Sequence, residues 1–393
     1  MNFNKIIFLY NTVFTERDYA RFGIFLLSKF GFTIEVWQMT AVTNPKIQTN
    51  ELFIQFADQR FASIRNFSHL NQIIDALNNE KQTTVYFNFL NFDFHTYKIF
   101  HQLAILNCYT ILFYIASLPV PFFSSISFRN KLVLICNKVH RFRLKHIKQI
   151  FLKVFTRLFF EVAKPKLFVV GGSMAYAQAK NINSDGADVL EAHALDYDVY
   201  LALRDLEPLQ DFPEGYSVFL ESDFCFSPDY KTLDFNPVTT PDRYFPYICN
   251  FLRHIENERQ TKIIICLHPK TYIDLHQYFP GFVLVKGSSA QLIQNAKLVI
   301  ATYTTAINFA VLFRKPLILV STDDIDVRYG AYIQATANCL GTKVYNLHSF
   351  DVKLDYVVSG VDWHYQDYIH KYIKSNSDDR YLWEIVADFL RNL

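Results

Sequence analysis

The sequence has little of what marks several common classes of protein. It contains only 11 glycines and 13 prolines among 393 residues, too few for long flexible linkers or low-complexity tracts. The formal net charge is +2, so no global field indicates a nucleic-acid partner, and we expect none. These absences favour a globular chain, and its length allows two domains that each bury a core.

Cysteines and long apolar runs are also scarce. The six cysteines form no CxxC pair and no His/Cys cluster at the spacing of metal ligands, which favours free thiols in a reducing compartment and no metal cofactor; they are Cys108, Cys136, Cys225, Cys249, Cys266 and Cys339. The most hydrophobic stretch, "YTILFYIASLPVPFF", is broken by Pro119 and Pro121 and is too short to span a bilayer. The N-terminal "IIFLY" is far shorter than a signal-peptide core. We therefore predict a cytoplasmic protein.

Short buried-strand patterns alternate with longer helical patterns along both halves of the chain. In the first half we expect strands at 5–11, 33–39, 83–89, 109–116 and 166–172. In the second half we expect them at 216–222, 262–268, 297–302 and 316–321. This alternation predicts parallel sheets with helices on both faces. We predict an α/β fold of two Rossmann-like, doubly wound domains that face a cleft.

The boundary between the halves is placed at "LRDLEPLQDFPEG", residues 203–215, which carries two prolines and mixed charge. We predict an N-terminal acceptor-side domain at 1–205 and a C-terminal donor domain at 213–352. The remainder, 353–393, is expected to be a helical tail that packs back across the domains. Its ending "SNSDDRYLWEIVADFL" predicts a terminal helix with Ser377 as a candidate cap.

Polar residues gather where strands of the second half end or the following helices begin. Ligands of open α/β sheets bind beyond the carboxyl ends of the strands. The residues at such places are His268, Lys270, Gly287, Ser288, Ser289, Thr302, Thr304 and Thr305. The sequence therefore predicts an imidazole, an ammonium group and several hydroxyls along one edge of one sheet.

Three of these places suggest anion binding. The helix predicted to start at Thr304 and Thr305 offers free amides and hydroxyls to a phosphate, although threonine is also an ordinary N-cap. The turn at Gly287 is followed by serines, which is equally common turn chemistry. His268 can donate to a phosphate oxygen or protonate a leaving group, and Pro269 ends the strand so that the ring is aimed outward.

Acidic residues occur near the same edge and near the domain boundary. Glu221 and Asp223 follow the first strand of the second half, where they are candidates for a general base, ligands of a sugar hydroxyl, or solvated loop acids. His193, Asp196 and Asp198 lie in "EAHALDYDVYL" near the crossing between domains. This second group completes no metal pattern, which favours a role at the domain interface.

The segment 137–164, "NKVHRFRLKHIKQIFLKVFTRLFFEVAK", is amphipathic and strongly basic, with one acidic residue. Basic amphipathic helices bind anionic membrane surfaces. A packed helix with a solvated face is the alternative. We predict that the segment attaches the protein to the inner face of the cytoplasmic membrane as a peripheral protein.

The region from about 216 to 330 resembles bacterial glycosyltransferases of the GT-B architecture that build capsule and lipooligosaccharide. The resemblance is carried by "IIICLHPK", by "GSSAQLIQNAKLVIATYTTAINFAV" and by "RKPLILVSTDD". It is similar to the pattern of bacterial sialyltransferases: a His-Pro at one strand end, a Ser/Thr pair before a later helix, and an acidic motif upstream. Capsule Kdo transferases and CDP-glycerol transferases have related versions.

The resemblance implies roles for individual residues. His268 would contact the donor phosphate and assist the leaving nucleotide, Thr304 and Thr305 would bind that phosphate, and Glu221 or Asp223 would match the acidic motif. Asn308 stands nearest to the position at which many UDP-sugar enzymes hold the ribose. On the acceptor side, Glu16 and Asp18 follow the first strand of the chain and are further candidates for the base.

The predicted function is metal-independent transfer of a sugar from a nucleotide-sugar to a bacterial surface glycan, free or lipid-linked. A CMP-linked acid sugar is favoured as the donor and a UDP-sugar is possible. The alternatives are a sugar-nucleotide epimerase or a CDP-glycerol-type phosphotransferase of the same fold, or a non-catalytic protein that binds nucleotide or glycan.

Overall fold

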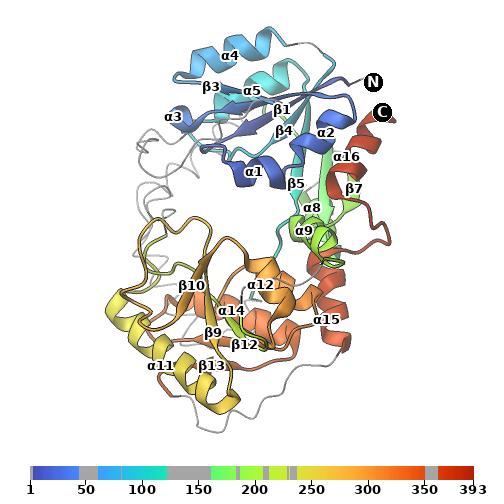
Figure 1. The fold of residues 1–393 in the computed structure, drawn as a ribbon. Helices are drawn as coiled ribbons and strands as arrows, with labels where there is room; N and C mark the ends of the chain where they lie inside the picture. Colours follow the sequence, from blue (N-terminus) through green and yellow to red (C-terminus); the bar gives the residue numbers. More distant parts are fainter. Residues whose placement is uncertain are drawn as a thin grey trace.

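A computed structural model of the protein describes residues 3–43, 61–80, 82–121, 161–182, 186–206, 212–227, 230, 237–349 and 362–393. These residues form two parallel β-sheets, each flanked by helices, which lie one above the other in Figure 1. The predicted α/β class with two doubly wound units is confirmed. Most of the basic segment lies outside the described residues, and only 161–164 are described, without helical structure.

The N-terminal sheet has seven strands in the order β3-β2-β1-β4-β5-β6-β7, and every neighbouring pair is parallel. The strands are β1 (Lys5–Tyr10), β2 (Thr33–Gln38), β3 (Ser63–Asn66), β4 (Thr84–Asn88), β5 (Tyr109–Tyr114), β6 (Leu167–Gly171) and β7 (Asp188–Ala192). The helices of this part are α1 (Glu16–Arg21), α2 (Ile24–Lys29), α3 (Thr40–Thr43), α4 (Leu70–Asn78), α5 (Tyr97–Ile105) and α8 (Ser173–Ile182). The central strands are apolar and buried because helices cover both faces.

The C-terminal sheet has six strands, again all parallel, in the order β10-β9-β8-β11-β12-β13. They are β8 (Ser217–Leu220), β9 (Ile263–Leu267), β10 (Val283–Lys286), β11 (Leu298–Ala301), β12 (Leu317–Ser321) and β13 (Val344–Asn346). Its helices are α11 (Pro241–Arg259), α12 (Ser289–Asn295), α13 (Ile307–Leu312) and α14 (Val327–Leu340). Because the strands are parallel, all their carboxyl ends lie at one edge of the sheet.

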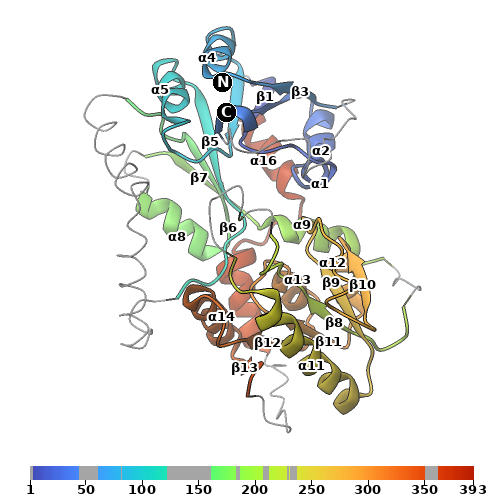
Figure 2. The ribbon, with the colours of Figure 1, turned by 90° about the vertical axis from the view of Figure 1, so that its left-hand side faces the viewer.

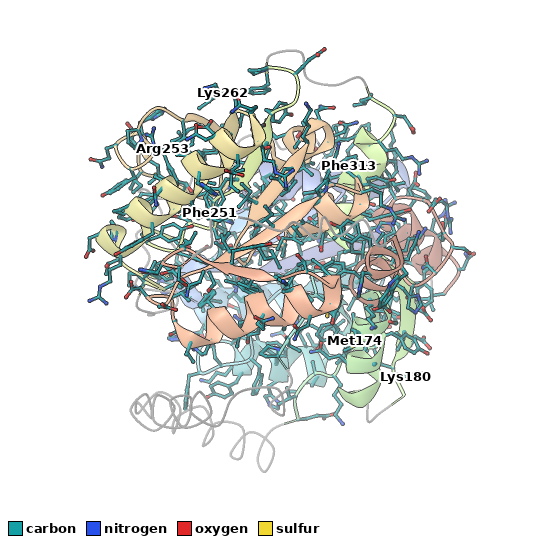
Figure 3. The ribbon with its side chains drawn as sticks, turned by 90° about the horizontal axis from the view of Figure 1, so that it is seen from below. Met174, Lys180, Phe251, Arg253, Lys262 and Phe313 are labelled. Carbon is teal, nitrogen blue, oxygen red and sulfur yellow. The ribbon has the colours of Figure 1, made fainter. Side chains whose placement is uncertain are left out.

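Helix α11 illustrates how the C-terminal sheet is covered. Its proline at the first position suits a helix start, where the amide has no helical partner. Phe251 is fully buried on the inner side of this helix, while Arg253 reaches out to the carbonyl of Pro280 and lies over the ring of Phe282. Both side chains are labelled in Figure 3. One face of the helix therefore supplies the core and the other ties down the turn before β10.

Between the two sheets lies α9 (Leu195–Leu203), at mid-height in Figures 1 and 2. The chain returns to this level near its end through α15 (Asp362–Tyr368) and the π-helix η2 (Ile369–Ile373). His193 and Lys374 pair as an isolated antiparallel bridge, so the outgoing and returning segments run side by side. The two parts of the molecule are thus connected twice within a small region.

The last helix described, α16 (Leu382–Arg391), packs on the N-terminal sheet, although the strands of the C-terminal sheet are nearer to it in sequence. Trp383 is 1% exposed and its ring lies 5.9 Å from that of Phe87 on β4. The expectation that Ser377 caps this helix is wrong. The helix begins at Leu382, with Tyr381 as the N-cap and Glu384 closing a capping box onto the Tyr381 amide.

Among the described residues, no helix combines the length and the apolar character that crossing a bilayer requires. Five of the six cysteines are described and each is a free thiol, whereas Cys136 lies outside the described residues.

Candidate functional site

The carboxyl edge of the C-terminal sheet brings several of the predicted residues together. Leu220 on β8 pairs with Cys266 on β9 and with Ala301 on β11, so the residues that follow these strands lie at about the same level. The hydroxyls of Ser222 and Thr302 form a 2.6 Å hydrogen bond between the ends of β8 and β11. Thr302 is 1% exposed. This hydrogen bond therefore joins the ends of β8 and β11, next to the end of β9 that His268 follows.

His268 directly follows β9 and is held in a defined orientation. The turn at Pro269 and Lys270 brings the amide of Lys270 to Nδ1 of the histidine, at 3.2 Å, and the amide of Thr271 donates to its carbonyl at 2.9 Å. Because Nδ1 accepts a hydrogen bond, the neutral ring carries its proton on Nε2. The half-buried ring therefore carries its N–H donor at Nε2.

The residues after β10 are arranged as a turn before a short helix. Gly287 has a φ of +83° and nothing lies within 4 Å of an added Cβ, so the backbone conformation and not crowding requires glycine there. Ser288 is the N-cap residue of α12, but its side chain makes no capping hydrogen bond. Ser289 opens the helix. Lys270 follows β9, the strand beside β10, and is exposed.

The two threonines after β11 lie in a loop, and the helix starts later than predicted. Helix α13 begins at Ile307 with Ala306 as its N-cap residue, because Thr304 and Thr305 form the preceding turn. The Thr304 hydroxyl accepts from the amide of Ala306 at 3.3 Å. Both threonines are half-buried. They lie between the end of β11 and the first turn of α13.

Glu221 and Asp223 are 3% and 2% exposed, so the interpretation as solvated loop acids is wrong. The carboxylate of Glu221 accepts a hydrogen bond from the amide of Asp223, whose φ of +56° places it in the left-handed region. Burial raises the pKa of Glu221 to about 8, and the Tyr244 phenol lies beside it. At neutral pH this group is therefore mostly a neutral acid.

Asn308 is fully buried and lies at a contact between elements. Its side-chain amide donates to Asp196 on α9 at 2.9 Å, and its oxygen accepts from the hydroxyl of Tyr368 on α15 at 3.0 Å. Asp196 also meets Arg21 of α1 at 3.3 Å. These contacts engage both ends of the amide, and its assignment to donor binding stays a prediction.

Glu16 and Asp18 lie on α1 in the N-terminal part. Asp18 closes the start of its helix, because its carboxylate accepts from the amide of Thr15 at 3.0 Å and from the hydroxyl of Thr15 at 2.7 Å. Glu16 is exposed in the first turn. Asp18 is therefore engaged in capping its helix, whereas Glu16 lies at the surface.

Within the described part of the chain, no group of three or more histidine, cysteine or acidic side chains is arranged to hold a metal ion.

No family model and no curated protein matches this sequence. Solved structures do match. A variant of the wall teichoic acid polymerase TagF is similar with a TM-score of 0.56 at 10% identity, over 99% of this chain and 88% of that one. A second TagF variant gives 0.52 at 9% identity, over 100% and 88%. The UGT2 of Phytolacca americana, solved with UDP-2-fluoro-glucose and pterostilbene, gives 0.53 at 10% identity over 99% of both chains.

The chain has the GT-B fold. The matches extend over essentially the whole chain, so the likeness includes both sheets and the returning tail. At these identities it concerns the fold alone, and the sialyltransferase-like motifs remain a matter of sequence resemblance.

Several residues of this site were not singled out from the sequence. Ser222 stands between the two acids in "LESD", and only its hydrogen bond to Thr302 distinguishes it from an ordinary loop serine. Tyr244 comes from α11, and its position beside Glu221 has no signal in the local sequence. Arg21 and Tyr368, which complete the contacts around Asp196 and Asn308, come from opposite ends of the chain.

Proposed function

We propose that the protein is a glycosyltransferase that moves a sugar from a nucleotide-sugar to a glycan acceptor at the carboxyl edge of the C-terminal sheet. The supporting observation is the grouping of the His268 Nε2 donor and the Thr304 and Thr305 hydroxyls at the ends of β9 and β11, on either side of β8. Two strand spacings, about 10 Å, separate the ends of β9 and β11. Side chains that extend from both sides of β8 suit a bound phosphate or pyrophosphate.

The chemistry follows from this arrangement. An acceptor hydroxyl attacks the anomeric carbon of the sugar, the bond from that carbon to the phosphate oxygen breaks, and the electron pair stays on the departing nucleotide. Hydrogen-bond donors that are already oriented stabilise the charge that develops there. In this proposal His268 Nε2–H and the threonine hydroxyls donate these hydrogen bonds, and Lys270 adds a positive charge.

The acceptor proton must pass to a base. Glu221 is protonated below about pH 8, so it is a poor base at neutral pH and is better suited to donate to, or hold, a hydroxyl of the donor sugar. Asp223 is equally buried, beside it. The exposed Glu16 on the N-terminal part is therefore our choice for the base, with Asp18 fixing the start of its helix.

For the donor we favour a CMP-linked acid sugar over a UDP-sugar, on the sequence resemblance given above. For the acceptor we favour a capsule or lipooligosaccharide chain, free or lipid-linked. The basic segment 137–164 would then bring the enzyme to an anionic membrane face.

Phosphotransfer from a CDP-linked polyol is the second candidate. The sequence resemblance extends to CDP-glycerol transferases, and one of the structural neighbours is by name a teichoic acid polymerase. An oriented histidine and hydroxyls at a phosphate suit that reaction as well. An epimerase and a non-catalytic binding protein of the same fold remain as further alternatives.

A thermal-shift series with CMP, CDP and UDP tests the proposal. A nucleotide at about 100 times its Kd stabilises a folded protein by about 2.7 kcal/mol. We expect CMP to raise the melting temperature of the wild type and to have little effect on a Thr304→Ala, Thr305→Ala double variant. Stabilisation by CDP alone would favour the phosphotransferase and by UDP alone a UDP-sugar enzyme.

Turnover then separates an enzyme from a binding protein. Release of CMP from a CMP-linked acid sugar, with a glycan acceptor present, is the expected activity. A wild-type protein that none of the three nucleotides stabilises would contradict the proposal.

A further inference from the structure

Asp196 is a buried carboxylate that joins the two halves of the molecule. It lies on α9, the helix between the two sheets (Figure 2), and is 7% exposed. One oxygen contacts the guanidinium of Arg21 on α1 at 3.3 Å, and the other accepts the Asn308 amide on α13 at 2.9 Å. A buried charge needs such partners, because removing it from water without them costs several kcal/mol.

The two partners of Asp196 belong to elements that carry or follow residues of the proposed reaction centre. Arg21 is the last residue of α1, the helix that begins with Glu16. Asn308 is the second residue of α13, three positions beyond Thr305. A single carboxylate therefore connects the helix of the proposed base with the turn of the proposed phosphate ligands.

Further contacts hold both ends of this connection. The indole of Trp383 on α16 donates to the carbonyl of Arg21 at 2.9 Å, and the hydroxyl of the fully buried Tyr368 donates to Asn308. Neither partner can shift without breaking hydrogen bonds to a third element. Burial raises the pKa of Asp196, while Arg21 and the Asn308 amide act in the opposite direction.

We infer that Asp196 is a positioning residue that sets the acceptor-side helix α1 in register with the donor-side turn of α13. This rests on the proposed function for what the two sides bind. The juxtaposition itself is given by the contacts of Asp196 with Arg21 and Asn308. Misplacing reacting groups by about 1 Å costs a reaction about a hundredfold, so the connection affects rate rather than affinity.

Hydrogen exchange of the unliganded protein tests the connection without any substrate. In Asp196→Asn, which keeps the shape and loses the charge, we expect faster exchange in both α1 and the first turn of α13, which belong to different sheets. Asp205→Asn is the matched control, because Asp205 follows the same helix and its side chain is 83% exposed beside Arg204. Acceleration in only one of the two helices, or in neither, overturns the inference.

Kinetics supply the second measurement. Asp196→Asn should lower kcat by about 10- to 100-fold and change the donor KM by less than about threefold, because the donor contacts are made by other residues. Arg21→Gln, which changes a partly exposed side chain, should reproduce the loss if Asp196→Asn does not fold. A rise in donor KM at unchanged kcat contradicts a positioning role. Absence of nucleotide binding in the wild type would refute the proposed function, while the exchange experiment still decides the role of Asp196.

Discussion

One backbone amide decides which nitrogen of His268 carries a proton. The turn after β9 directs the amide of Lys270 to Nδ1, and the proton is left on Nε2. From the sequence, His-Pro-Lys at a strand end predicted an outward-facing imidazole but not its tautomer. The tautomer depends on a turn geometry that residue types alone do not fix.

Replacing His268 tests its role in the departure of the nucleotide. In His268→Ala we expect turnover to fall about 100- to 1000-fold, because one oriented donor to the developing charge is lost. Nucleotide affinity should stay within a few-fold of the wild type, measured by thermal shift alongside initial rates. His276→Ala is the control, because that histidine is exposed and its ring pairs with the equally exposed Asp274. Unchanged turnover in His268→Ala would end this assignment.

Glu221 predicts a pH dependence of stability. Its pKa rises from an ordinary value of 4.5 to about 8 on burial, so the folded protein keeps a proton that the unfolded chain releases. The contribution to stability is complete below about pH 4.5 and is lost as the pH rises through 8. Between pH 5 and 8 the unfolding free energy of the wild type should fall, relative to Glu221→Gln, by on the order of a few kcal/mol.

Urea unfolding at several pH values measures this difference. Glu258→Gln, at an exposed position of α11, serves as the control and should follow the wild type. If the unfolding free energies of the wild type and Glu221→Gln change in parallel from pH 5 to 8, the prediction that Glu221 is a buried neutral acid is wrong.

The strands that the sequence failed to predict share one physical property. The nine strands that were predicted are all present, and those not named were β3, β7, β10 and β13. Each of the four is an edge strand of its sheet. An edge strand has a single neighbour and is partly solvated, and β3, β7 and β13 lack the continuous apolar run by which central parallel strands are recognised. β10 is the exception, because the apolar run "FVLV" at 282–285 does indicate a strand.

The glycine between α1 and α2 packs closely against α16. Gly23 has a φ of +57°, and an added Cβ would lie 2.2 Å from the indole of Trp383. Gly31 has a φ of +91° and nothing within 4 Å of that position. Gly31→Ala should therefore cost only the backbone strain, about 1–2 kcal/mol. Gly23→Ala should cost about 1–3 kcal/mol more, because α16 must move away.

Thermal unfolding of the two variants separates strain from crowding. Equal losses of stability would show that α16 does not press on this junction.

At the scale of the whole molecule, the tail and the first strands form one core. Leu382, Trp383, Val386 and Leu390 of α16 belong to the same apolar cluster as Phe8 on β1 and Phe87 on β4. The sequence predicted a terminal helix from its apolar stripe. It did not indicate which sheet that stripe covers, because an apolar stripe shows only that a helix face is buried and not which element buries it.

Trp383→Ala should weaken the half of the protein that is far from it in sequence. Truncating a buried tryptophan costs about 3–5 kcal/mol. Faster hydrogen exchange is expected in β1 and β4, with the nucleotide response of the C-terminal sheet retained. Trp363→Ala is the control, because Trp363 is 60% exposed on α15. Loss of protection confined to the C-terminal sheet would contradict this packing.

The position of α16 also has a consequence for biosynthesis. A ribosome makes β1 long before α16, and domains made early usually fold while the rest is still being translated. Here the N-terminal sheet cannot close its apolar core until α16 has also been synthesised. The nascent N-terminal half must wait with an uncovered surface, so a premature stop just before Leu382 should damage the part of the protein that was synthesised first.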